Sequence, residues 1–276
     1  MTESPLVGRV EAPDLHLISF NVRRRMPAIG PRTADRWAQR SPALAALLAL
    51  ERPHLIGAQE VLPDQDRFIR TALGSDFSRV GRGRETNGQG EGCPIYYDRT
   101  RLQLLDWVQQ ALSDTPEVPG SRSWGNLTPR ILVRAEFRDR ATGIRLLAIN
   151  THFDHLSRRS RVTAAHTIRQ LVVGQALPAV VTGDLNSGED TAPLTELFAG
   201  GGVVDAWGAA RTRLTAEWGT FPNYREPRRD RKRIDWIAVS PTVEVERIGI
   251  NTERPGGVWA SDHLPVQAVL RMPTAP

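Results

Sequence analysis

The chain has 276 residues, of which 40% are hydrophobic, so it can bury a large core; we expect one domain over residues 1–276 with its core at about residues 14–272. A formal charge of +5 and a sequence pI of about 10.2 favour anionic partners such as nucleic acids, phosphate esters or acidic lipids. The single cysteine, Cys93, excludes an internal disulfide and a cysteine-rich zinc site.

Short apolar runs rich in β-branched residues alternate with longer helical patterns along the chain. The short runs predict strands at residues 15–20, 54–59, 131–137, 144–150, 179–184, 234–240 and 264–270. Ser41 and Pro42 suit the N-cap and first turn of a helix that runs to Leu50. Thr142-Gly143 suits the turn of a hairpin. Further helices are predicted over 156–174 and 193–198. The alternation indicates an α/β layered fold with helices outside the sheets.

Polar side chains recur where the predicted strands end. They are Asn21, Glu60, Asn150, His152, Asp184 and Asn186 after strands, and Asp262-His263 before the last strand. Residues i and i+2 of a strand point to the same side, so Asp184 and Asn186 would face one pocket if the extended geometry persists. Taken alone, GDLN is better explained as a turn, because Asp, Asn and Gly are turn residues. Their recurrence at several strand ends favours a functional site.

The oxygen donors among these residues predict a divalent cation. Asn21, Glu60 and Asp262 offer two carboxylates and an amide, which suit Mg²⁺ or Mn²⁺. Zn²⁺ would require more nitrogen or sulfur ligands. We therefore expect Mg²⁺ or Mn²⁺ as the cofactor.

The remaining polar groups suit the hydrolysis of a phosphoester. Asp235 is a carboxylate that could orient the ring of His263, and an oriented histidine beside a Lewis acid can transfer protons or stabilise charge. Asp184 would position or deprotonate the attacking water. Asn186 and His152 would donate hydrogen bonds to phosphoryl oxygens.

The chain resembles the endonuclease/exonuclease/phosphatase superfamily, the DNase I-like proteins, through a set of motifs in the family order. The motifs are SFN (19–21), QE (59–60), NTHFDH (150–155), GDLN (183–186), RIDWI (233–237) and SDHLPV (261–266). GDLN together with SDHLPV is the specific part of this signal. The resemblance implies a four-layer α/β sandwich, in which two mixed β-sheets pack face to face with helices outside.

The resemblance also implies roles for the matching residues. Glu60 would be the principal metal ligand, with Asn21 and Asp262 close to the same ion or its waters. The implied catalytic residues are His152, Asp184, Asn186, Asp235 and His263. The implied substrate-binding residues are Arg130, Asn150 and His155.

One segment matches a bacterial subgroup of the superfamily, and two features depart from the family pattern. LSDTPEVPGSRSWGN (112–126), followed by Pro129-Arg130, resembles the subgroup, and Arg130 would then reach the phosphate. Arg23 stands where abasic-site endonucleases often carry an acidic residue, which disfavours a role in DNA repair. Residues 225–233, REPRRDRKR, hold six basic and two acidic side chains where the subgroup is usually glycine-rich.

These observations predict an Mg²⁺- or Mn²⁺-dependent hydrolase of phosphoester bonds. It would cleave a phosphomonoester or phosphodiester by in-line attack of an activated water, and we expect a small or lipid phosphoester as substrate. One alternative is a nuclease acting on DNA or RNA, for which the 225–233 segment would contact flanking phosphates. Another is a catalytically inactive basic binding module, which the complete set of site residues argues against.

The sequence also bears on location and assembly. No apolar run is long enough to span a bilayer, and the N-terminus MTESPLVGRV lacks the features of a secretory signal. We therefore expect no integral membrane segment, a cytoplasmic location and a monomer.

Overall fold

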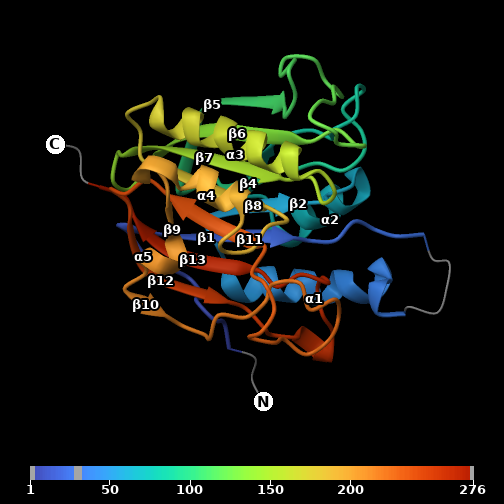
Figure 1. Ribbon diagram of the computed structural model, residues 1–276. Coiled ribbons are helices and arrows are strands. Elements are labelled where there is room, and N and C mark those ends of the chain that lie inside the picture. The colour runs from blue at the N-terminus through green and yellow to red at the C-terminus, as the bar shows by residue number, and fades with distance from the viewer. Residues whose placement is uncertain (1–3, 28–32, 274–276) are drawn as a thin grey trace.

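The computed structural model describes residues 4–27 and 33–273, and its strands form two mixed sheets packed face to face (Figure 1). The first sheet contains, in spatial order, β10 (Thr212–Arg213), β12 (Glu244–Ile250), β13 (Val266–Arg271), β1 (Asp14–Asn21), β2 (Leu55–Gln59), β4 (Ile95–Asp98) and β3 (Phe77–Val80). The second contains β5 (Leu102–Ala111), β6 (Ile131–Asp139), β7 (Arg145–His152), β8 (Ala179–Asp184), β11 (Asp235–Val239) and β9 (Val204–Asp205). The central pairs β1–β2 and β7–β8 are parallel.

Helices cover the outer face of each sheet, which gives the predicted four-layer α/β sandwich. The helices are α1 (Trp37–Glu51), α2 (Pro63–Leu73), α3 (Arg158–Val173), α4 (Ala192–Leu197) and α5 (Ala206–Ala209), with short 3₁₀ segments at Thr33–Asp35, Ala199–Gly201 and Pro255–Gly257. α1 and α2 pack on the first sheet, and α3 and α4 pack on the second (Figure 1). Within the described ranges no helix is both long and apolar enough to cross a bilayer.

Side chains of strand β1 pack on both faces of the first sheet. Leu15 and Leu17 point into the core between the sheets, whereas Ile18 and Phe20 pack against the helices of the outer layer. Alternate residues of a strand face opposite sides, and a strand that is covered on both sides is apolar on both. This is why the central strands appear in the sequence as continuous apolar runs.

The predicted strands all exist within one or two residues of their expected bounds, but the start of the first helix was predicted wrongly. Helix α1 begins at Trp37, so Pro42 lies inside it rather than in its first turn. Tertiary contacts stabilise the first helical turn of α1, which precedes Pro42. Trp37 packs edge-on against Phe68 at 5.3 Å, and the buried Arg40 donates to the carbonyl oxygen of Val22 at 3.0 Å.

Candidate active site

The strand register places polar side chains of the second sheet in one row. His152 is the cross-strand neighbour of Asp184, and Asp184 is the neighbour of Asp235. The last residue of β7, the last of β8 and the first of β11 therefore lie side by side. The sequence indicates the strand ends, but only the pairing of β8 with both neighbours brings these three residues together.

An amide joins this row to the first sheet. Asn21, which ends β1 and is fully buried, donates through Nδ2 to Asp184 Oδ2 and to Glu60 Oε1, each at 3.0 Å. Glu60 follows β2 with a φ of 60°, in the left-handed region. The row of predicted catalytic residues in one sheet and the predicted metal ligand of the other thus share one hydrogen-bond donor.

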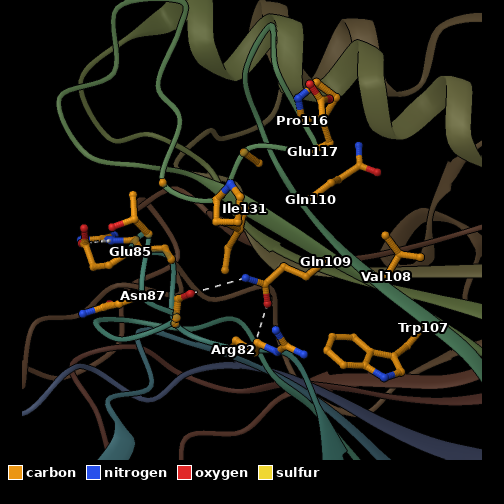
Figure 2. A pocket seen from close by; sticks show the side chains of 17 residues that line it. Arg82, Glu85, Asn87, Trp107, Val108, Gln109, Gln110, Pro116, Glu117 and Ile131 are labelled. Carbon is orange, nitrogen blue, oxygen red and sulfur yellow. Dashed lines mark hydrogen bonds and ion pairs between the residues drawn. The ribbon is translucent and has the colours of Figure 1, made fainter.

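The cleft above this junction has a volume of about 440 Å³. The predicted site residues that line it are Glu60, Arg130, His152, His155, Asp184, Asn186, Asp262 and His263. Asn21 and Asp235 lie behind them, each fully buried and bonded to a lining residue. A second cavity, shown in Figure 2, shares Arg84 with the cleft.

Asn150 is the one predicted site residue that the structure places away from the cleft. It is fully buried between the sheets, where Nδ2 donates to the carbonyl oxygens of Ala58 and Pro94 and Oδ1 accepts from Gln59 at 2.7 Å. The sheets approach closely here, because a Cβ on Gly57 would lie 1.9 Å from Thr182 Oγ1. Asn150 therefore ties the sheets together and does not contact a ligand in the cleft.

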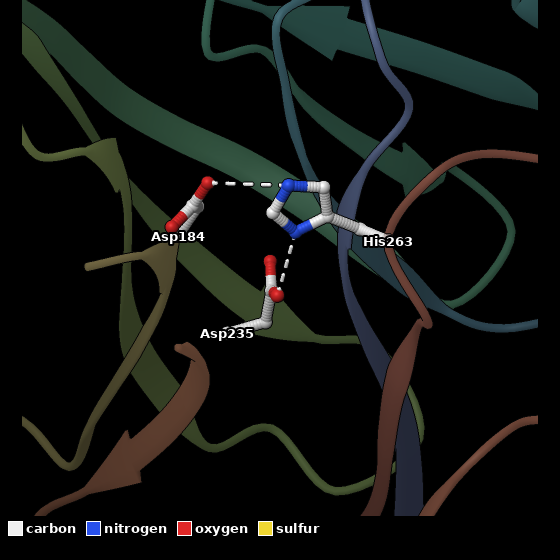
Figure 3. A group of neighbouring side chains, drawn as sticks. All are labelled: Asp184, Asp235 and His263. Carbon is white, nitrogen blue, oxygen red and sulfur yellow. Dashed lines mark hydrogen bonds and ion pairs between the residues drawn. The ribbon is translucent and has the colours of Figure 1, made fainter. Parts of the chain in front are cut away.

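The imidazole of His263 lies between two carboxylates (Figure 3). Its Nδ1 is 2.8 Å from Asp235 Oδ2, and its Nε2 is 3.8 Å from Asp184 Oδ2. Burial opposes the charged ring, but the charge and hydrogen bond of Asp235 outweigh it and raise the pKa of His263 to about 10. Ligand atoms of these three residues lie within 4.8 Å of one another, a spacing that also admits a metal ion.

Asp184 and Asn186 form a turn and also belong to the site. Asn186 has a φ of 47°, so the strand geometry does not persist past Asp184 as the same-side argument required. Instead, Asp184 Oδ1 accepts the backbone N–H of Asn186 at 2.9 Å, which is an Asx-turn. The turn leaves Asp184 Oδ2 near the cleft and points Asn186 Nδ2 at His152 Nε2, 3.1 Å away.

His152 is a neutral ring beside these groups. Burial lowers its pKa to about 4, although the nearby Asp184 favours the charged form. Its Nε2 is 3.5 Å from Asp184 Oδ2. Burial and the charge of Asp235 raise the pKa of Asp184 above its usual value. Two buried histidines of one cleft thus differ in charge, because only His263 has a carboxylate bonded to its Nδ1.

The donor set for a cation consists of Glu60 and Asp262. Burial would raise the pKa of Glu60, but His152, the backbone N–H of Arg24 and the Asn21 amide outweigh it and lower the pKa to about 2. Burial raises the pKa of Asp262. Two carboxylates that line one cleft fit Mg²⁺ or Mn²⁺. Asn21, the third predicted ligand, directs its nitrogen at the carboxylates, and its Oδ1 accepts the N–H of Arg23 at 2.9 Å.

Arg23 is a fixed cation beside this donor set. Its Nε is 3.4 Å from Asp262 Oδ2, and its Nη1 is 4.0 Å from Glu60 Oε2. Asp35 holds the same guanidinium, with 3.0 Å between Nη2 and Oδ2. A divalent ion at Glu60 and Asp262 would therefore bind next to a positive charge.

Four arginines of the cleft are candidates for binding an anion. Arg23, Arg24, Arg84 and Arg130 all line this cleft. Arg130 is 4% exposed, its Nε contacts Asp154 at 3.3 Å, and its Nη2 contacts His155 Nδ1 at 3.0 Å. Within residues 4–27 and 33–273 its Nη1 has no hydrogen-bond partner. A buried guanidinium nitrogen without a partner is costly, and a phosphoryl oxygen would satisfy it.

The basic segment 225–233 does not line the cleft, although its flanking residues Phe221 and Ile234 do. Arg233 is buried and pairs with Asp205 at 2.7 Å, and Arg228 pairs with Asp230. These contacts leave fewer free cations than the sequence suggests.

A sandwich of two mixed sheets with helices on both outer faces is the DNase I-like fold. The chain belongs to the Endonuclease/Exonuclease/phosphatase family, because the sequence model of that family matches residues 18–263. Proteins of this family are usually hydrolases that act on phosphoesters.

Solved structures and a curated protein resemble this chain. An endonuclease/exonuclease/phosphatase from Bacteroides vulgatus has 31% identity and a TM-score of 0.86, over 94% of this chain and 99% of that one. A mannosyl-6-phosphatase from Bacteroides thetaiotaomicron VPI-5482 has 30% identity and a TM-score of 0.85, over 93% and 99%. "Protein angel" of Drosophila melanogaster is 27% identical over 178 residues, which are 62% of this chain and 49% of that protein. This chain therefore spans about half the length of that curated relative.

Proposed function

We propose that this protein is an Mg²⁺- or Mn²⁺-dependent phosphoesterase that acts on a small phosphoester. The proposal depends above all on one observation. A single cleft brings the carboxylates of Glu60 and Asp262 within reach of the Asp235–His263 pair and of Asp184. Family membership supports the class of reaction.

The carboxylates of Glu60 and Asp262 would hold the divalent ion, which supplies Lewis-acid stabilisation of phosphoryl charge when it is bound. Asn21 fixes Glu60 by donating to Oε1 and thereby sets the direction of the carboxylate. Arg130 would bind a phosphoryl oxygen through its unpartnered Nη1.

Residues at and near the ends of β8 and β11 would orient the attacking water and stabilise the charge that develops on the phosphoryl group. Asp184 would orient the attacking water and accept its proton while the water oxygen bonds to phosphorus. The ester P–O bond breaks on the opposite side, and the leaving oxygen takes up a proton from the solvent to become an alcohol. His263, held by Asp235, would stabilise the charge that develops on the phosphoryl oxygens. Asn186 donates through Nδ2 to His152 Nε2 and to the carbonyl oxygen of Phe153, so it would position His152.

Two observations support a small substrate. The first is the 30% identity to a mannosyl-6-phosphatase over 93% of this chain. The second is that no residue of the 225–233 segment lines the cleft, so this basic segment would not contact phosphates beside the reacting one. A lipid phosphoester or a nucleic acid is the alternative substrate class. The cytoplasmic location and the monomeric state stay predictions.

A substrate panel with Mg²⁺ and with Mn²⁺ tests the proposal. It includes sugar phosphates, p-nitrophenyl phosphate, phospholipids, RNA, and single- and double-stranded DNA, with Glu60→Ala as the blank. We expect hydrolysis of small phosphomonoesters by the parent and none by the blank. Preferential cleavage of DNA or RNA would contradict the small-substrate proposal, and equal rates for parent and blank would contradict the site.

A further inference from the structure

The second cavity is built from the segment that marks the bacterial subgroup. Its volume is about 490 Å³, close to that of the cleft. Its walls are the hairpin 82–92, residues Trp107–Ala111 of strand β5, and Pro116–Gly120 of the 112–130 loop (Figure 2). None of the predicted site residues lines this cavity.

One side chain separates the cavity from the cleft. Arg84 lines both, and its Nη1 is 2.9 Å from Oε2 of Glu91, a cleft residue. The wall on the other side continues into the cleft along the chain, since Ile131 lines the cavity and Arg130 lines the cleft. The cavity and the cleft are therefore adjacent at Arg84, and a ligand held at Arg130 would have to pass this side chain to enter the cavity.

The hairpin wall is fixed in position relative to the catalytic residues. Val61, the residue after Glu60, pairs with Gly92 through hydrogen bonds of 2.8 and 3.2 Å in the two directions. Inside the hairpin, the N–H of Arg84 donates to the carbonyl oxygen of Glu91 at 3.0 Å. The hairpin is thus hydrogen-bonded to the residue that follows the predicted metal ligand Glu60.

The loop wall is also ordered by its own contacts. The N–H of Ala111 donates to the carbonyl oxygen of Pro116 at 2.8 Å, and the hydroxyl groups of Ser113 and Ser121 are 2.6 Å apart. Gly120 has a φ of 77°, and a Cβ there would lie 2.6 Å from the side chain of Thr86 in the hairpin. The loop and the hairpin therefore meet at Gly120, at the margin of the cavity.

The lining offers donors and acceptors with no net charge. Arg82 and Arg84 are balanced by Glu85 and Glu117. Among the described residues, the exposed side chain of Glu117 makes no hydrogen bond or ion pair, so it is free to bind a ligand. Small apolar surfaces lie between these groups at Val108, Pro116 and Ile131.

We propose that this cavity binds the leaving-group portion of the substrate, and that this portion is a neutral polyhydroxylated group such as a sugar. A sugar presents hydroxyl groups that donate and accept in turn, with small apolar C–H faces between them. The balanced charge disfavours a second phosphate, because a polyanion would need an excess of cations. The proposal rests on the phosphoesterase function proposed above and specifies its substrate class.

The experiment compares two kinds of substrate that differ in the leaving group. Mannose 6-phosphate and glucose 6-phosphate carry a sugar, whereas p-nitrophenyl phosphate does not. The test variant is Glu117→Ala. The control is Asp106→Ala, which removes one carboxylate from an exposed position of β5 that does not line the cavity.

We expect the test variant to raise KM for the sugar phosphates by about 10-fold, the loss of one or two ligand hydrogen bonds, with kcat within about twofold. KM for p-nitrophenyl phosphate should not change, and the control should behave as the parent does on both substrates. Thermal unfolding checks that the variant is folded, and Glu117→Ser at the same exposed position replaces it if it is not.

Three results would overturn the proposal while leaving the phosphoesterase function intact. They are an unchanged KM for sugar phosphates, an equal loss on both substrates, and a parent that hydrolyses p-nitrophenyl phosphate but neither sugar phosphate. A parent that hydrolyses no phosphoester would instead contradict the proposed function itself.

Discussion

A buried histidine lies near each end of strands β1 and β2, and the two rings, those of His263 and His16, differ in charge. At one end, His263 is bonded to Asp235, and its pKa is raised to about 10. At the opposite end, His16 is fully buried, its Nδ1 is 3.0 Å from the carbonyl oxygen of Gly8, and its pKa is lowered to about 3. Burial is the largest influence on both rings and opposes the charge on both. A bonded carboxylate is what reverses the outcome.

The two clusters also differ in what their polar groups contact. At the opposite end, Glu51 accepts the N–H groups of Leu6, Val7 and Gly8, and Nε2 of the buried His16 has no hydrogen-bond partner among the described residues. At the cleft end, Arg130 also keeps an unpartnered nitrogen, but this nitrogen belongs to a charged guanidinium that lines an open volume. A buried polar atom without a partner therefore does not by itself indicate a site, whereas a buried cation that lines a cleft favours one.

The largest expected effect is on catalysis at the cleft end. His263→Ala and Asp184→Asn should each lower kcat by a factor of about 10² to 10⁴, the range for a positioned proton-transfer or charge-stabilising group. Asp235→Asn should slow turnover as well, because His263 would lose the partner of its Nδ1. Steady-state kinetics with a phosphomonoester measures this. His16→Gln is the matched control, and it should leave kcat unchanged; a near-parental rate for Asp184→Asn would show that GDLN is only a turn.

The opposite end should respond to pH through stability instead. Burial is the main cause that lowers the pKa of His16 to about 3 and of His54 to about 4, so the unfolded chain binds more protons than the folded one below a pH of about 6.5. Each buried ring then lowers the free energy of unfolding by up to about 1.4 kcal/mol per pH unit as the pH falls from about 6 towards 4.

Urea unfolding of the parent and of His16→Gln over this pH range measures the effect. The substitution should remove the contribution of one histidine and flatten the decline. An identical pH dependence in both proteins would contradict the account of His16 as a buried neutral ring.

A smaller effect is expected on the affinity for metal. Arg23 places a guanidinium between Asp262 and Glu60, so Arg23→Ser should tighten Mn²⁺ binding by roughly 3- to 10-fold through loss of cation repulsion. Isothermal titration calorimetry measures it without reference to turnover. Arg25→Ser is the control, since Arg25 pairs with Asp64 outside the cleft. Equal or weaker Mn²⁺ affinity in the Arg23 variant would count against a cation at Glu60 and Asp262.

The smallest effect is expected from the basic segment. Replacing Arg228, Arg229, Arg231 and Lys232 with Ser should change KM for a small phosphoester by less than about twofold, because none of these residues lines the cleft. A polynucleotide substrate would respond differently. The slope of log affinity against log salt would then flatten by roughly 2 to 4 units, and that result would favour the nuclease alternative.

The fold was predictable wherever burial leaves a pattern in the sequence. Central strands such as β1 and β8 are covered on both faces and appear as continuous apolar runs. The edge strand β5 and the helix α2 were missed for the opposite reason. β5 is largely exposed along LQLLDWVQQA, and α2 buries Gln65 and Asp66 together with a single large apolar side chain, Ile69. Strand β5 lacks the alternation on which the prediction of strands relies, and α2 has helical periodicity but few apolar residues to reveal it.

The site was predictable in residue type and less so in position. Asn150 and His152 are two residues apart on β7 and face the same side, yet the first sheet covers Asn150 and leaves His152 at the cleft. Arg23 was noted only as a departure from the family pattern, whereas the structure places it against both carboxylates of the donor set. Both facts depend on how the two sheets pack, which the local sequence does not encode.

The most direct test of the central claim is the metal dependence of hydrolysis by the intact protein. p-Nitrophenyl phosphate turnover is measured with Mg²⁺, after removal of all metal with excess chelator, and after Mg²⁺ is returned, for the parent and for Glu60→Gln. We expect that chelation abolishes turnover, that returned Mg²⁺ restores it, and that Glu60→Gln needs a higher Mg²⁺ concentration for the same rate. Full turnover in excess chelator, with the metal content shown to be zero, would contradict the central claim.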